Sequence, residues 1–183
     1  MDTTTRLIAC VLGGTAAGAK TELHDVAFAV GASLEGVHEQ LLDGWFGSPR
    51  GLHVDAWCFL DRVDGYRVRL ARKPADNGLH LYFINIGGYR HGEFAERHAW
   101  SFFGAPNKAA AKAQAKRTLL QGHEEIHKDD LHEIDDCLQI GRVAGWHVHL
   151  VPDAQATTPA AINGYFPLPK STIDDWITRR ASA

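Results

Sequence analysis

Two pairs of residues near the start of the 183-residue chain combine a carboxylate with an imidazole at a spacing of two. The first pair is Glu22 with His24, and the second is His53 with Asp55. In a β-strand both members of such a pair point to the same face, because alternate residues share a face. A carboxylate beside an imidazole can serve as a general base with its orienting partner, or as two ligands of a metal ion.

The same residue types recur in the second half of the chain. Glu96 and His98 match the first pair, and His132 with Asp135 matches the second pair with one residue more between them. A β-bulge would accommodate the additional residue. With Asp25, which follows His24, the candidate ligand-binding residues are Glu22, His24, Asp25, His53, Asp55, Glu96, His98, His132 and Asp135.

The sequence leaves several roles open for these pairs. Polar pairs on adjacent strands can fix strand order by hydrogen bonds or ion pairs, which is a structural role. The same side chains could instead line a groove between the repeats and bind a small polar ligand, or carry out metal-assisted or acid–base hydrolysis. A non-catalytic interaction module that forms a homodimer through exposed strand edges is a further alternative. No G-x-S-x-G motif marks a nucleophile, and the sequence assigns no catalytic residue, metal or cofactor.

The recurrence extends along most of the chain as an internal duplication. LIACVLGGTAAGAKTELHDVAF (7–28) and LYFINIGGYRHGEFAERHAWSF (81–102) share the pattern GGxxxGxxxExHxxxF. LHVDAWCFLDRVDGYRVRL (52–70) likewise matches LHEIDDCLQIGRVAGWHVHL (131–150). The order is the same in both halves, which indicates two tandem copies of one unit.

Each copy predicts the element order β-β-α-β-β. The expected first strands are 6–13 and 81–87, the second strands are 23–31 and 97–104, and the closing hairpins turn at 63–65 and 143–145. Ser33 and Asn107 are expected to cap the helices, and the GGxxxG glycines to supply positive φ at a turn. These elements predict an α+β fold with a mainly antiparallel sheet and helices on one face.

The expected boundaries follow the repeats. Residues 1–72 form the first repeat, 73–79 a linker and 80–152 the second repeat, and the two repeats are expected to form one compact domain. Residues 153–183 form a tail with a short C-terminal helix, for which Ser171–Asp174 resembles a capping box.

The amino-acid composition argues against nucleic acid and membranes as partners. A net charge of −3 and a pI near 6.4 give no attraction to nucleic acid, and no apolar run approaches the roughly 20 residues that span a membrane. The N-terminal run LIACVLGG recurs inside the chain as LYFINIGG, so we read it as a strand rather than as an export signal. With three cysteines expected as free thiols, a cytoplasmic location follows.

The motifs ELHDVAF, LHVDAW, DGYRVRL, LYFINIGGY and GEFAERH together resemble a bacterial family known as domain of unknown function 1543. The resemblance covers most of residues 6–152. It implies a bacterial, cytoplasmic protein and carries no reaction, substrate or cofactor.

Overall fold

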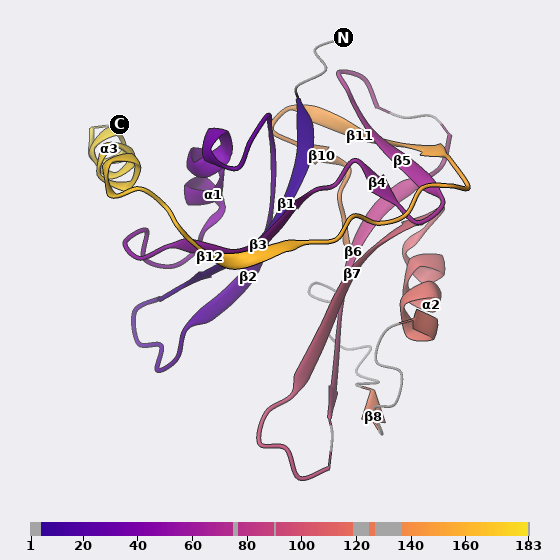
Figure 1. Ribbon diagram of the computed structural model, residues 1–183, viewed down its shortest axis with the longest axis horizontal. Helices are drawn as coiled ribbons and strands as arrows, with labels where there is room; N and C mark the ends of the chain where they lie inside the picture. The colour runs from indigo at the N-terminus through magenta and orange to yellow at the C-terminus, as the bar shows by residue number, and fades with distance from the viewer. Residues whose placement is uncertain (1–4, 75–76, 90, 119–124, 127–136, 183) are drawn as a thin grey trace. The chain divides into compact units, whose positions relative to one another are not determined.

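The computed structural model describes residues 5–74, 77–89, 91–118, 125–126 and 137–182 (Figure 1). The chain forms two compact units. Unit 1 contains residues 1–61 and 159–183, and unit 2 contains residues 62–158. The fold is α+β, and the strand pairs in the described part are antiparallel.

Unit 1 is built on a four-stranded sheet. Its strands are β1 (Arg6–Gly14), β2 (Leu23–Gly31), β3 (His53–Phe59) and β12 (Ile162–Pro167), in the order β12-β3-β1-β2. The apolar segment at the N-terminus is therefore a central strand of this sheet, bordered on both sides. The bounds of β1 and β2 confirm the strands that the sequence predicts at 6–13 and 23–31.

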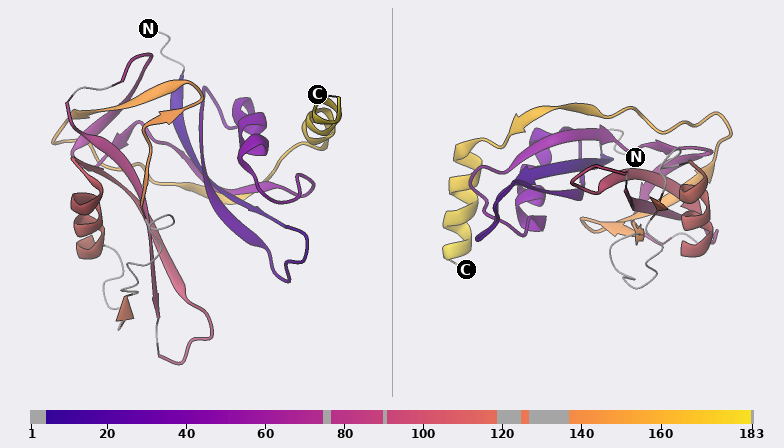
Figure 2. Two further views of the ribbon diagram at one scale, coloured as in Figure 1. Left: turned by 180° about the vertical axis from the view of Figure 1, so that it is seen from behind. Right: turned by 90° about the horizontal axis from the view of Figure 1, so that it is seen from below.

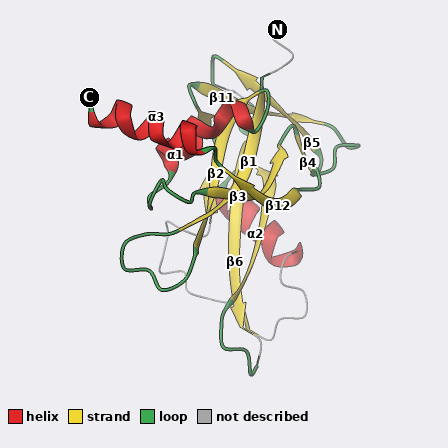
Figure 3. Cartoon of the chain, turned by 60° about the vertical axis from the view of Figure 1, so that its left-hand side comes forward, coloured by secondary structure: helices red, strands yellow, loops and turns green. Residues whose placement is uncertain are grey.

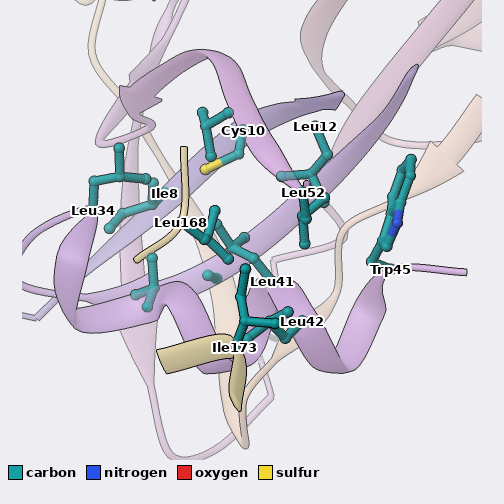
Figure 4. Packing of buried hydrophobic residues seen from close by; sticks show 13 residues of the cluster. Ile8, Cys10, Leu12, Leu34, Leu41, Leu42, Trp45, Leu52, Leu168 and Ile173 are labelled. Atoms are coloured by element: carbon teal, nitrogen blue, oxygen red, sulfur yellow. The ribbon is translucent and has the colours of Figure 1, made fainter. Parts of the chain in front are cut away.

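A helical segment follows β2 and covers one face of this sheet. It consists of the 3₁₀ turn η1 (Glu35–Val37) and the helix α1 (His38–Gly44). The hydroxyl of Ser33 accepts a hydrogen bond from the Gly36 N–H at 3.2 Å, as expected for the residue that caps the segment. The core of unit 1 combines buried side chains of β1, β3, α1 and the C-terminal segment (Figure 4). Its buried members are Ile8, Cys10, Leu12, Ala29, Leu34, Val37, Leu41, Leu42, Trp45, Leu52, Val54, Leu168 and Ile173.

The C-terminal helix α3 (Lys170–Ala181) lies beside α1 (Figures 1 and 3). The Trp176 indole N–H and the Arg180 guanidinium both donate to the Asp43 carboxylate of α1, at 2.9 and 2.8 Å. The expected capping box was wrong: Pro169 occupies the N-cap position, so Ser171 already lies inside the helix. No helix in the described part of the chain is long and apolar enough to cross a membrane.

One sheet of unit 2 joins hairpins from both repeats. It contains β4 (Arg62–Val63), β5 (Tyr66–Ala71), β10 (Arg142–Val143) and β11 (Trp146–Pro152), in the order β10-β11-β5-β4. The central pair, β5 with β11, brings together the last strands of the two sequence copies. The hairpin turns lie where the sequence predicts them, with φ of 81° at Gly65 and 79° at Gly145.

The other sheet of unit 2 contains the long hairpin of β6 (His80–Tyr89) and β7 (Arg97–Ala105), which Figure 2 shows from behind. The short strands β8 (Glu125–Ile126) and β9 (Cys137–Gln139) are paired to β6. The helix α2 (Lys108–Thr118) packs on this hairpin through small alanine side chains. The buried members of this core are Tyr82, Ile84, Ala105, Ala111, Ala115 and Cys137.

The predicted cap of α2 is present. The side-chain oxygen of Asn107 accepts a hydrogen bond from the Ala110 N–H at 2.9 Å. The sequence also predicts Gly122 as the C-terminal stop of this helix, and Gly122 lies outside the described residues.

The imidazole of His38, at the start of α1, makes stability depend on pH. Burial lowers the pKa of His38 below its ordinary value of 6.5, and the Glu35 carboxylate offsets only part of this effect. The unfolded chain then binds a proton at His38 more readily than the folded chain. We predict that this contribution to stability is complete above about pH 6.5 and is lost as the pH falls below it.

Denaturant unfolding between pH 8 and pH 5 tests this prediction. The decline in the free energy of unfolding toward acid pH should be smaller in His38→Gln than in the wild type. An identical pH dependence in both proteins would contradict the assignment to His38.

Candidate functional site

Three strands of unit 1 meet at Gly13 in β1. Gly13 is paired with His24 of β2 on one side and with His53 of β3 on the other. Directly opposite residues share a face of a sheet, so the two imidazoles flank the position where residue 13 would carry a side chain. A Cβ atom at Gly13 would collide with His53 Nε2 and lie 2.7 Å from Asp55 Oδ2. The absence of a side chain therefore makes room for this group.

The next glycine serves the opposite face of the sheet. A Cβ atom at Gly14 would lie 2.9 Å from the Trp45 ring, which belongs to the core. The expectation that these glycines supply positive φ was wrong for Gly13 and Gly14, which lie inside a strand. It is confirmed for Gly18, where φ is 84°. Gly13 and Gly14 thus allow neighbouring side chains to approach β1 closely on both faces of the sheet, and they do not form a turn.

A bulge in β3 sets the position of Asp55. Ala56 pairs with Val11 and Val54 pairs with Leu12, which leaves Asp55 as an additional residue between them. Bulges of this kind redirect a side chain. Here the carboxylate reaches the two imidazoles. The sequence predicted a bulge only for the second half, between His132 and Asp135, and those residues lie outside the described part of the chain.

Each imidazole lies close to both carboxylates. His53 Nε2 is 3.2 Å from Glu22 Oε1 and 3.3 Å from Asp55 Oδ1. His24 Nε2 is 3.2 Å from Asp55 Oδ2 and 3.7 Å from Glu22 Oε2. Each carboxylate thus turns one oxygen to each ring. We call Glu22, His24, His53 and Asp55 the imidazole–carboxylate cluster.

The backbone fixes the orientation of the His53 ring. Its Nδ1 lies 3.0 Å from the carbonyl oxygen of Gly51, and its side chain is 4% exposed. A carbonyl oxygen only accepts hydrogen bonds, so Nδ1 carries a proton. Nε2 consequently faces the two carboxylates. A neutral ring would direct its lone pair at anionic oxygens there, and a proton or another donor is needed to offset the repulsion.

The rest of the cluster is accessible from solvent. The side chains of His24 and Glu22 are 46% and 48% exposed, and that of Asp55 is 31% exposed. Asp55 Oδ2 is itself buried and accepts no hydrogen bond from the part of the chain that the structure describes, although His24 Nε2 lies 3.2 Å from it. The cluster therefore combines a buried, oriented base with acceptors that a bound molecule could reach.

Tyr165 is a residue of this site that the sequence did not reveal. It lies in an irregular part of β12, between Asn163 and Phe166, where the register to β3 shifts. Its ring contacts the His53 ring with a centroid distance of 4.5 Å, yet the residue is 68% exposed. No motif surrounds Tyr165 in the sequence, because its position depends on the tail returning to pair with β3.

Asp25 does not join the cluster. It is paired with Leu12, one position along from Gly13, and so belongs to the opposite face of the strand. Its carboxylate accepts a hydrogen bond from the Val26 N–H at 2.7 Å.

The second repeat contains part of the same arrangement. His98 Nε2 lies 3.4 Å from Glu96 Oε2, and a Cβ atom at Gly87 would lie 2.7 Å from Glu96 Cδ. The other ring nitrogen of His98 lies 3.1 Å from the side-chain oxygen of Asn85. Gly87 thus has the role of Gly13, with His98 directly opposite on β7.

The described residues offer no metal centre, and the three cysteines are buried. No three or more His, Cys, Asp and Glu side chains within the described ranges form a group that could hold a metal ion. Cys10, Cys58 and Cys137 are buried. Burial, with a contribution from Cys58, raises the pKa of Cys10 to about 12, which keeps this thiol protonated at neutral pH.

We predict that Gly13→Ala separates the cluster. The new methyl group must displace the buried His53 ring or Asp55, which should cost about 1–3 kcal/mol of unfolding free energy and shift the His53 ring resonances in NMR spectra. Gly44→Ala is the control, since a Cβ atom there meets no atom within 4 Å. If Gly13→Ala is as stable as the wild type and its His53 resonances are unchanged, the close approach of His53 and Asp55 to Gly13 is not needed.

Comparisons with known proteins agree with this architecture. A crystal structure of the protein Il1583 from Idiomarina loihiensis is similar, with a TM-score of 0.71 and 33% sequence identity over 91% of this chain and 99% of that chain. A search of curated proteins gave no match. The model of the family described as Domain of Unknown Function (DUF1543) matches two segments, residues 19–70 and 93–150. The chain therefore belongs to the DUF1543 family and carries two tandem copies of its domain.

Proposed function

We propose that unit 1 binds a small polar ligand at the imidazole–carboxylate cluster, and that the ligand presents a protonated amine or another N–H donor. The observation that carries the proposal is the approach of both imidazole Nε2 atoms to both carboxylates above Gly13. The proposal needs residues of unit 1 only.

The charges of the cluster favour a donor ligand. Two carboxylates supply four acceptor oxygens, and each of the four faces an imidazole nitrogen. The Nδ1–H of His53 already donates a hydrogen bond to the carbonyl oxygen of Gly51. With neutral rings the cluster carries an excess of negative charge, which a cationic group would offset.

A purely structural role accounts less well for the exposed members. Ion pairs between half-exposed side chains contribute about 0–1 kcal/mol, and here they surround a buried histidine and a buried oxygen without a hydrogen bond. A cationic ligand at the accessible carboxylate of Glu22 would offset the charge that these weak pairs leave.

Acid–base catalysis is a second candidate, favoured by the contact between His24 and Asp55. A carboxylate 3.2 Å from one ring nitrogen would hold its proton, while the other ring nitrogen of the half-exposed His24 takes a proton from water or substrate. Hydrolysis of a small polar substrate would be the reaction class.

The repeat suggests the same roles for Glu96 and His98 in the second copy. We also propose that each copy is one β-β-α-β-β unit, residues 1–72 and 80–152, joined by 73–79 and followed by the tail 153–183. The similar order of elements, β1-β2-α1-β3 in the first copy and β6-β7-α2-β8-β9 in the second, supports this division.

Titration with methylammonium chloride, followed by the ring resonances of His24 and His53, tests the binding proposal. Two non-hydrogen atoms at no more than about 1.5 kcal/mol each limit the affinity to a Kd on the order of 10 mM. We expect saturable shifts, at least tenfold weaker binding in Glu22→Gln and Asp55→Asn, and less than a twofold change in Asp25→Asn. Acetate at the same ionic strength should cause no saturable shift.

Stability separates this proposal from a structural role. Glu22→Gln should change the unfolding free energy by less than about 1 kcal/mol, because the side chain is half exposed. A loss of several kcal/mol without any methylammonium binding in the wild type would instead assign the cluster to the fold.

A further inference from the structure

We infer that unit 2 carries an oxyanion site, separate from the cluster of unit 1, in a pocket of about 430 Å³. The polar side chains that line it are His80 of β6, Gln139 of β9, Arg142 of β10 and His147 of β11. The ligand class is a phosphate group, free or on a small molecule.

The described lining carries positive charge only. Arg142 supplies a permanent positive charge, the two histidines supply imidazole rings, and none of the lining residues that the structure describes is Asp or Glu. Among the described residues Arg142 has no ion pair, whereas other arginines of unit 2 do: Arg67 binds Asp153 and Arg97 binds Glu93. The guanidinium in the pocket is thus available to an anion.

Arg142 and His147 are direct cross-strand partners in the β10–β11 hairpin. Side chains at such positions lie close together, so one ligand can contact both. A guanidinium fork matches two oxygens of a phosphate, which makes arginine the favoured partner.

His80 presents a second donor. The amide nitrogen of Gln139 lies 3.2 Å from His80 Nδ1, so this ring nitrogen accepts a hydrogen bond. The ring proton then resides on Nε2 and remains available for a ligand oxygen. Donors from β6, β10 and β11 around one pocket suit a tetrahedral oxyanion with several oxygens better than a planar carboxylate.

Backbone hydrogen bonds hold the walls of the pocket together. The Ile140 N–H donates to the Leu81 carbonyl at 2.8 Å, and the Val148 N–H donates to the Gly141 carbonyl at 3.0 Å. These bonds tie the segment between β9 and β10 to both β6 and β11. The backbone that carries the donors is therefore fixed before a ligand arrives, which reduces the entropic cost of binding.

Titration with sodium phosphate at constant ionic strength tests the inference through the backbone amide resonances of Gly141 and Val148. We expect saturable shifts and at least tenfold weaker binding in Arg142→Gln. Arg142→Lys, which keeps the charge without the fork, should bind with intermediate affinity. Arg69→Gln is the matched control, because Arg69 is an exposed arginine of β5 outside the pocket, and it should change the affinity less than twofold.

Other outcomes would overturn the inference. Shifts that do not saturate, or equal losses of phosphate affinity in Arg142→Gln and Arg69→Gln, would show that phosphate is attracted non-specifically to positive charge. Acetate should bind at least tenfold more weakly than phosphate, and equal affinities would overturn the assignment to phosphate. Neither result would affect the cluster of unit 1, which the methylammonium titration tests separately.

Discussion

The imidazole–carboxylate cluster of unit 1 depends on the absence of a side chain at Gly13. A central strand normally places a side chain on each face of its sheet at every second residue. At Gly13 that side chain is absent, and the neighbouring strand β3 fills the space with His53 and Asp55. On the other face, the space at Gly14 is filled by Trp45 of the core. The glycine pair therefore couples the packing of the core to the geometry of the cluster.

Burial of His53 is the energetic constraint within the cluster. A buried imidazole needs partners for both nitrogens, and here Gly51 satisfies one and the two carboxylates face the other. Beside this buried ring, the side chains of His24 and Glu22 are half exposed to water. This combination of one fixed ring and one accessible ring makes the cluster suitable for binding a donor ligand or for proton transfer.

Much of the fold could be predicted from the sequence. The duplication, the strands around Gly13 and Gly87, the caps at Ser33 and Asn107 and the hairpin turns rest on local patterns, which act within a few residues. The tail was harder to predict, because the start of α3 is set by Pro169 and its position by contacts of Trp176 and Arg180 with α1.

The candidate site could be predicted only as separate pairs. The spacing of Glu22 with His24, and of His53 with Asp55, was enough to expect two polar pairs, but their meeting depends on β1 lying between β2 and β3. Such non-local pairing has no signature in one sequence. The bulge at Asp55 and the contact of Tyr165 with His53 have the same non-local origin.

The orientation of the His53 ring is the central claim, and the imidazole nitrogen spectrum of His53 tests it most directly. In a long-range ¹H–¹⁵N correlation, Nδ1 should be protonated in the wild type and in Glu22→Gln. The Nε2 resonance should move in Glu22→Gln and stay in place in Asp25→Asn. A ring whose lone pair lies on Nδ1, or an Nε2 resonance that ignores Glu22, would contradict the orientation and the proposal that depends on it.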